Sequence, residues 1–200
     1  MTENKKVKDN LFVDLFCSDQ DGTRNFLSLY NALHNTNLKF DEVKIEPKRI
    51  EQVMYRTLSN DVAMEINDKL IVMVEQQSTI NKNMPLRFVM YISRLYESFV
   101  EEKDKYRRTL VEIPTPEFYV IYNGQDNYPK ESILQLSDAF KDKSIDIQLD
   151  LKVTVYNVNK YRDLDIVQQC RAMNDYCKFI DLINYEKSNG VKTDRYKHAI

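Results

Sequence analysis

Two short apolar runs on either side of a polar trio constrain the fold of this chain most. The runs are Val62 to Ile66 and Leu70 to Glu75, and the trio between them is Asn67-Asp68-Lys69. A polar turn between alternating apolar residues is typical of a β-hairpin. The sequence therefore predicts two antiparallel strands joined by a tight turn centred on Asp68.

This turn also predicts a register. With Asp68 at the centre, Ile66 lies opposite Leu70, and Asp61 lies opposite Glu75. Directly opposed residues have Cβ atoms roughly 4.5–5.5 Å apart, and like charges there are destabilising. A divalent cation between the two carboxylates removes the conflict, and strand alternation puts Gln77 on the same face as Glu75. The alternative is two acids at a solvated strand end, with the register shifted by one residue and no shared ligand.

Several motifs in and beyond the hairpin resemble those of one protein family. They are Asn60-Asp61, Glu75 to Thr79 (EQQST), Asn81, Asn83 to Arg87 (NMPLR), Tyr91, Asp9 to Phe16 (DNLFVDLF), Phe26 to Leu33 (FLSLYNAL), Pro116 to Gly124 (PEFYVIYNG) and Leu136 to Phe140 (LSDAF). Together, and in this order, they are similar to the Rpn family, the recombination-promoting nucleases and transposase-like proteins of the PD-(D/E)XK superfamily. The resemblance runs from about Asp9 to about Ile183.

The resemblance implies an α/β fold with a PD-(D/E)XK, restriction-endonuclease-like core. Its mixed central sheet is flanked by helices in the order αβββαβ, followed by a further strand and a C-terminal helix. It implies that Asp61 and Glu75 bind Mg²⁺, with Mn²⁺ or a second divalent ion as alternatives, and that the backbone carbonyl of Gln76 completes the protein ligands. Gln77 stands where the superfamily has a lysine, so its amide can position water or phosphate but supplies no cation.

Other candidate side chains lie before and after the hairpin. The superfamily often adds an acid from its first helix, which makes Asp9 and Asp14 candidates; solvated acids near a helix start are the alternative. Lys82, Arg87 and Arg94 are the candidates for binding nucleic acid. Arg87 and Arg94 fall on one face of a predicted helix, where they can grip phosphate or instead pair with neighbouring carboxylates.

Composition sets the remaining bounds. The 200 residues, 42% hydrophobic and 30% charged, suit one globular domain over 1–185 with a polar tail at 186–200. The net charge of -2 means that any DNA contact must come from a local basic patch. The polar N-terminus and the absence of a long apolar run predict a cytoplasmic protein without a membrane span. Cys17, Cys170 and Cys177 have no CxxC spacing and are expected to be reduced core thiols.

Hydrophobic spacing predicts the other elements. They are two helical pieces around 11–16 and 26–33 with a break at 18–22, a polar loop at 35–47, a strand at 50–58, a helix from Pro85 toward Glu102, a strand at 118–122, a helix or extended segment at 133–140, a strand from Ile147 to Val155, and a last helix capped by Asp163. The two histidines, His34 and His198, have no clear sequence context for a nucleophile–base pair.

These observations predict a Mg²⁺-dependent DNA endonuclease associated with recombination, transposition or mobile elements. Its activity is expected to be low because Gln77 replaces the motif lysine. The alternative is a module that keeps the nuclease fold without useful catalysis and binds DNA or a protein partner. DNA is the expected partner, and the sequence leaves a homo-oligomer open.

Overall fold

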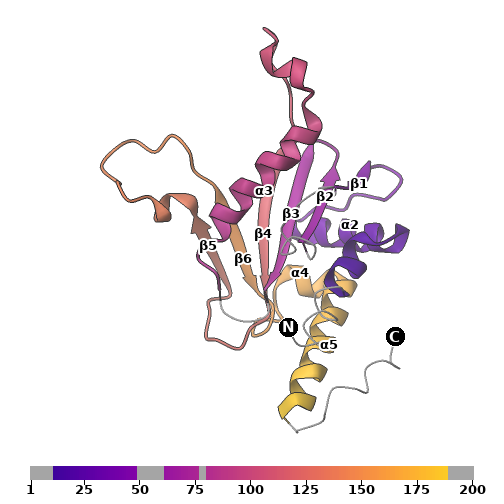
Figure 1. The fold of residues 1–200 in the computed structure, drawn as a ribbon. Helices are drawn as coiled ribbons and strands as arrows, with labels where there is room; N and C mark the ends of the chain where they lie inside the picture. The colour runs from indigo at the N-terminus through magenta and orange to yellow at the C-terminus, as the bar shows by residue number, and fades with distance from the viewer. Residues whose placement is uncertain (1–10, 49–60, 77–79, 189–200) are drawn as a thin grey trace.

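The computed structural model describes residues 11–48, 61–76 and 80–188. At its centre is a six-stranded sheet in the order β1-β2-β3-β4-β6-β5 (Figure 1). The strands are β1 (Ile45–Pro47), β2 (Asp61–Ile66), β3 (Lys69–Gln76), β4 (Thr115–Tyr122), β5 (Glu131–Gln135) and β6 (Lys152–Asn157). Strands β3, β4 and β6 are parallel, whereas β1, β2 and β5 pair antiparallel with their neighbours. The prediction of an α/β fold with a mixed sheet is confirmed.

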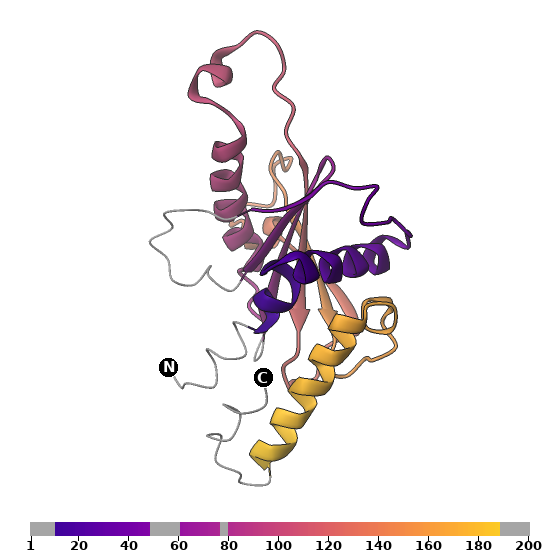
Figure 2. The ribbon, with the colours of Figure 1, turned by 90° about the vertical axis from the view of Figure 1, so that its right-hand side faces the viewer.

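Helices cover both faces of the sheet (Figures 1 and 2). They are a helix at 11–17, α2 (Gln20–His34), α3 (Met84–Phe99), α4 (Asp165–Gln168) and α5 (Arg171–Ser188), with 3₁₀ turns η2 (Glu102–Tyr106) and η3 (Leu136–Ala139). One core lies between the sheet and the helix at 11–17, α2, α4 and α5, and we call that side of the sheet the α2 face. The other core lies under α3, on the α3 face. Strand alternation divides β2 accordingly, because Val62 and Met64 belong to the first core and Ala63 to the second.

The predicted hairpin is confirmed, but its register is not. The turn has two residues, Asn67 and Asp68, so Ile66 pairs with Lys69. Asn67 has a φ of 51°, a left-handed conformation that asparagine tolerates and that tight hairpin turns require. Its backbone N–H donates to the carbonyl of Lys44 at 3.1 Å. The turn is therefore one residue shorter than the predicted trio, and every cross-strand pair shifts by one.

The edge strand β1 lies where the sequence predicts a loop. Ile45–Pro47 pairs with β2 although only one of its residues is a typical strand former. A strand this short leaves no periodicity to detect, and Pro47 is compatible with it because β1 is the edge of the sheet. The strand predicted at 50–58 lies outside the described residues.

The C-terminal half departs from prediction at two points. The strand expected from Ile147 starts only at Lys152, and the residues before it belong to neither helix nor strand. Asp163 does not cap a helix; its carboxylate accepts a hydrogen bond from Lys130 Nζ at 2.6 Å. Leu164 is the residue that precedes α4, and the apolar stripe expected for one helix is divided between α4 and α5.

Other predictions agree with the structure. Pro85 lies in the first turn of α3, where its missing N–H costs nothing. The cysteines Cys17, Cys170 and Cys177 are free and buried. Burial raises the pKa of the Cys177 thiol to about 11, so this side chain behaves as a core residue. Within the described ranges, none of the helices combines the length and apolar character that crossing a membrane requires.

Candidate functional site

The parallel strands β3, β4 and β6 have their carboxyl ends at the same end of the sheet. We call this end the carboxyl edge; it is distinct from the lateral edge strands β1 and β5. The last residues of the parallel strands are Gln76 of β3, Tyr122 of β4 and Asn157 of β6. Strand β2 runs the other way, so its first residue, Asp61, reaches the same edge. Sites in sheets of this kind typically form beyond the carboxyl ends of the strands. Glu75, the penultimate residue of β3, is also at this edge.

The register at this edge differs from prediction. Asp61 pairs with Val74, and Glu75 pairs across the parallel ladder with Ile121. In a regular pleat, position 61 shares the α3 face with Ala63, whereas position 75 shares the α2 face with Ile121. The prediction that the two acids oppose each other is therefore wrong. The orientations of their side chains, and all of Gln77, lie outside what the structure describes.

Buried amides hold the carboxyl edge together. Asn123 directly follows β4 and donates to the hydroxyl of Tyr176 on α5 at 2.6 Å. Asn157 donates to the carbonyl of Tyr128 at 2.8 Å and accepts from the backbone N–H of Lys160 at 3.2 Å. Both amides are almost fully buried, so their hydrogen bonds fix the loops after β4 and β6. Asn123 belongs to the motif from Pro116 to Gly124, but no local pattern reveals its contact because Tyr176 is 53 positions further along the chain.

The first helix packs beside this edge. The ring of Phe12 meets that of Tyr176 edge-on, with centroids 5.5 Å apart. Phe12 and Phe16 are fully buried on the α2 face, the face to which position 75 belongs. Asp14 lies on the same helix and is exposed to solvent. Asp9 precedes the described residues.

The basic candidates lie on or just before α3. This helix begins near the carboxyl edge and runs toward the other end of the sheet (Figure 1). Lys82 is exposed just before the helix, and Arg87 is half-buried with Nη1 3.3 Å from Met84 Sδ. Arg94 is exposed about 10 Å further along, because an α-helix rises 1.5 Å per residue. Lys82 and Arg87 are therefore the two candidates nearer the carboxyl edge.

Among the residues with described side chains, no three His, Cys, Asp or Glu groups are close enough to hold a metal ion. This does not bear on Asp61 or Glu75, whose side chains are not described.

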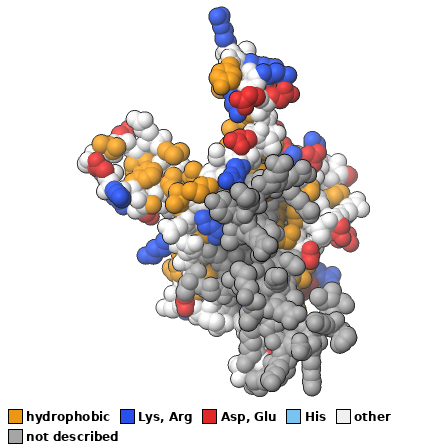
Figure 3. All heavy atoms as spheres, viewed as in Figure 1, with side chains coloured by type: hydrophobic (Ala, Val, Ile, Leu, Met, Phe, Trp, Pro, Cys, Tyr) orange, Lys and Arg blue, Asp and Glu red, His pale blue; other side chains and the backbone are white. Residues whose placement is uncertain are grey.

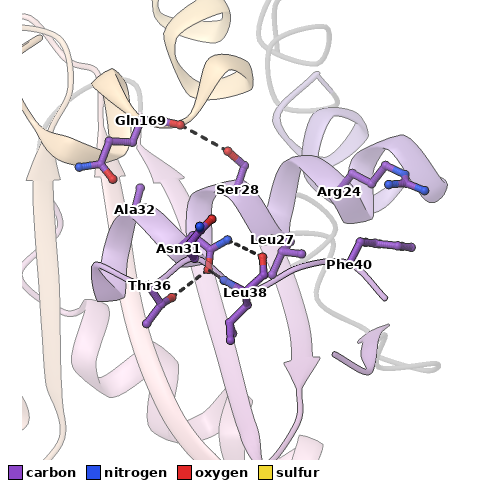
Figure 4. A pocket seen from close by; sticks show the side chains of 10 residues that line it. Arg24, Leu27, Ser28, Asn31, Ala32, Thr36, Leu38, Phe40 and Gln169 are labelled. Atoms are coloured by element: carbon purple, nitrogen blue, oxygen red, sulfur yellow. Dashed lines mark hydrogen bonds between the residues drawn. The ribbon is translucent and has the colours of Figure 1, made fainter. Parts of the chain in front are cut away.

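A pocket of about 370 Å³ lies elsewhere, between α2 and the loop that follows it (Figure 4). The guanidinium of Arg24 stacks over the ring of Phe40 at 4.3 Å. Asn31 bonds to both backbone groups of Leu38 at 3.0 Å and accepts from the Thr36 hydroxyl at 2.8 Å. Its amide therefore holds the loop against the helix. Among the described residues, no acidic side chain and no predicted site residue lines this pocket.

Comparison with protein families shows to which family the chain belongs. The family described as "Putative transposase, YhgA-like" matches residues 7–186, nearly all of the 200-residue chain. The chain belongs to this family. The YhgA-like family is part of the Rpn, PD-(D/E)XK-like group, so the resemblance of the motifs is confirmed. Comparison with curated proteins and with solved structures gives no match. Membership associates the chain with transposition and mobile elements.

The YhgA-like chain also contains a polar cluster that sequence reasoning missed. Glu117 on β4 accepts hydrogen bonds from Lys69 Nζ at 2.7 Å, His34 Nε2 at 2.6 Å and the Tyr119 hydroxyl at 2.8 Å. His34 Nδ1 lies 3.0 Å from the carbonyl of Tyr30. The two ring nitrogens thus face a backbone carbonyl on one side and a carboxylate on the other. The cluster joins α2, β3 and β4.

The neighbours of Glu117 stabilise the ionised form of its carboxylate. Burial by itself raises the pKa of Glu117, but the hydrogen bonds from Lys69, Tyr119 and His34 outweigh it and hold that pKa below its usual value. The hydrogen bond to Glu117 in turn raises the pKa of Lys69. The contacts of this cluster join positions up to 83 apart along the chain, which is why no local pattern reveals them.

We expect Glu117→Gln to lower the free energy of unfolding at neutral pH by about 1.5–3 kcal/mol, the usual contribution of a hydrogen bond to a charged group. Because the folded pKa of Glu117 is lowered, its contribution is present above the unfolded pKa of about 4.3 and is lost as pH falls through the folded value. Urea unfolding of both proteins at pH 7 and in acid measures this difference. It should shrink in acid, and exposed Glu112→Gln should show no such loss. A pH-independent difference would contradict the ionic role.

Proposed function

We propose that this protein is a metal-dependent DNA endonuclease whose site is the carboxyl edge. The observation that carries the proposal is the family match over residues 7–186, in a chain whose Asp61 and Glu75 are both on strands that reach this edge. The strands of the hairpin bring to one end of the sheet two acids that are 14 positions apart in the sequence.

The proposed donor set suits a hard cation. It consists of the carboxylates of Asp61 and Glu75 and the backbone carbonyl of Gln76, the last residue of β3. Oxygen ligands with retained waters are what Mg²⁺ prefers, and Mn²⁺ accepts the same set. In a regular pleat, positions 61 and 75 belong to opposite faces of the sheet. The proposal therefore requires that the backbone leaves the regular pleat at Asp61, so that both carboxylates can reach one ion. Such a departure is possible because Asp61 is the first residue of β2 and pairs with β3 but not with β1.

The chemistry that a bound divalent ion supplies is polarisation of the scissile phosphate and acidification of an attacking water. Asp61 and Glu75 would hold the ion and orient it toward the phosphate. Gln77 can orient the water or a phosphate oxygen by hydrogen bonds, but it cannot offset developing negative charge. Lys82 and Arg87 would contact the DNA backbone near the start of α3, and Arg94 would extend that contact along the helix. Turnover is expected to be slow, since the lysine cation is missing.

Nicking of supercoiled plasmid tests this function. Wild-type protein should nick the plasmid with Mg²⁺ or Mn²⁺ and should lose that activity when EDTA is added. Asp61→Ala should lack the metal-dependent activity but keep the wild-type melting temperature within a few degrees. Wild-type protein that nicks equally with EDTA, or not at all with either metal, would contradict the proposal.

A further inference from the structure

The segment between η3 and β6 exposes apolar side chains in an alternating pattern. We call residues 140–151 the arm. Ile145, Ile147 and Leu149 are 67%, 45% and 59% exposed, and residues 141–150 are all exposed. Figure 3 shows hydrophobic side chains gathered on this projection at the left of the view. Monomeric proteins rarely leave several large apolar side chains exposed side by side without a binding role.

The arm has the pattern of a strand but pairs with no strand in the part of the chain that the structure describes. Alternation of Ile145, Ile147 and Leu149 with polar residues is typical of a strand with one buried face. Its base is held in place, because the Asp150 carboxylate accepts from the Ser137 backbone N–H at 3.0 Å and from its hydroxyl at 3.2 Å. Among the described residues, no strand forms ladder hydrogen bonds with 145–149. Unpaired, apolar, strand-like segments are templates for pairing with another chain.

We propose that residues 145–149 pair antiparallel with the same residues of a second copy of this chain, about a two-fold axis at Ile147. In that register Ile145 lies opposite Leu149, Ile147 lies opposite its own copy, and Asp146 lies opposite Gln148. All three apolar residues of each copy then meet apolar residues on one face. The arrangement is isologous and closes as a dimer.

Charge selects this register over its neighbours. Centring the pair on Gln148 keeps the apolar contacts but puts Asp146 opposite Asp150, and centring it on Asp146 puts that carboxylate opposite its own copy. Like charges directly opposite each other destabilise a pair of strands. Centring on Leu149 would place Ile147 opposite Leu151, whose carbonyl already accepts from the backbone N–H of Leu136 at 2.9 Å. It would also extend the pairing to Lys152 and Val153, which already pair with β5. The axis at Ile147 satisfies the apolar and the charge pattern without using residues that already bond to β5 or to Leu136.

The paired surface is small. Standard interfaces bury about 800 Å² per partner from roughly 20–30 residues, far more than a five-residue strand provides. The edge strand β5 adds Ile133, which is 57% exposed, close to the arm in sequence. The dimer is therefore reversible and depends on protein concentration.

Sedimentation velocity across a concentration series tests the dimer. Wild-type protein should shift from monomer to dimer, and Ile147→Lys should weaken dimerisation by at least about tenfold. The matched control is Leu110→Lys, which changes a 91% exposed leucine on the projection between η2 and β4 and should leave the dissociation constant unchanged. Wild-type protein that stays monomeric throughout, or an Ile147→Lys variant that dimerises like wild type, overturns the proposal.

Cross-linking tests the register. Directly opposed residues have Cβ atoms about 4.5–5.5 Å apart, close to the 3.5–4.5 Å of a disulfide. Under mild oxidation Ile147→Cys should therefore form a covalent dimer, with little background because the native cysteines are buried. Gln148→Cys, whose partner in this register is Asp146, should cross-link much more slowly. Equal rates, or faster cross-linking at 148, overturn the axis at Ile147.

Discussion

Glu75→Gln is expected to reduce metal-dependent cleavage by roughly 100-fold or more. The substitution keeps the size of the side chain but removes the charge of a proposed metal ligand. Stabilisation of transition-state charge by a bound metal is worth several kcal/mol, and each 1.36 kcal/mol is a factor of ten in rate. Cleavage rates at saturating Mg²⁺ and calorimetric titration with Mn²⁺ measure the two consequences separately. Both the rate and the affinity should fall.

The control for this prediction is Asp68, an acid in the turn of the same hairpin. Asp68 is in the turn, at the opposite end of β3 from Glu75, so Asp68→Asn should leave cleavage and Mn²⁺ affinity unchanged. Active wild-type protein together with an equally active Glu75→Gln variant would rule out the carboxyl-edge site while leaving the nuclease function standing. Loss of cleavage with full Mn²⁺ affinity would assign Glu75 a role other than metal binding.

Phe12→Ala is expected to lower the free energy of unfolding by about 3–5 kcal/mol, the usual cost of truncating a buried phenylalanine. Phe12 is fully buried, and its ring lies 5.2 Å from that of Phe16 and 5.5 Å from that of Tyr176. The cavity would lie between the first helix and α5, where little can collapse to fill it. Urea unfolding measures the loss. In a chain of this size the melting temperature should fall by about 2–4 °C per kcal/mol.

Leu182→Ala provides the comparison. Leu182 on α5 is 52% exposed, so its truncation should lower the free energy of unfolding by well under 1 kcal/mol. A loss below about 1 kcal/mol for Phe12→Ala would mean that the first helix contributes little to the core. The position matters for function because Tyr176 also accepts the hydrogen bond from Asn123. Loosening this contact is therefore expected to disturb the carboxyl edge as well as the core.

For the hairpin, the local sequence predicted the strands but not their register. Alternation of apolar residues placed β2 and β3 correctly, because the pattern reports which positions are buried. It could not choose between a two-residue and a three-residue turn. That choice depends on the left-handed backbone of Asn67 and on its contact with Lys44, which is 23 positions earlier. One residue of difference moved Asp61 from opposite Glu75 to opposite Val74.

In the arm, the local sequence predicted a strand longer than the one that pairs in the sheet. The alternation from Ile147 to Val155 correctly indicated a strand, but only the part from Lys152 onward finds neighbours in the sheet. A sequence pattern shows that a segment is suited to pairing, and it does not show where the partner is. The unpaired half is the feature on which the proposed dimer rests.

By itself the sequence determined the family, the mixed α/β class, most helices and strands, and the buried state of the cysteines, since all of these follow from motifs or from periodicity along the chain. Only the tertiary structure decided the hairpin register, the edge strand β1, and the ties between Asn123 and Tyr176 and between Glu117, Lys69 and His34. These features join residues that are far apart in sequence. Their energies depend on distances and burial that arise only when helices and sheet pack together, so no local pattern encodes them.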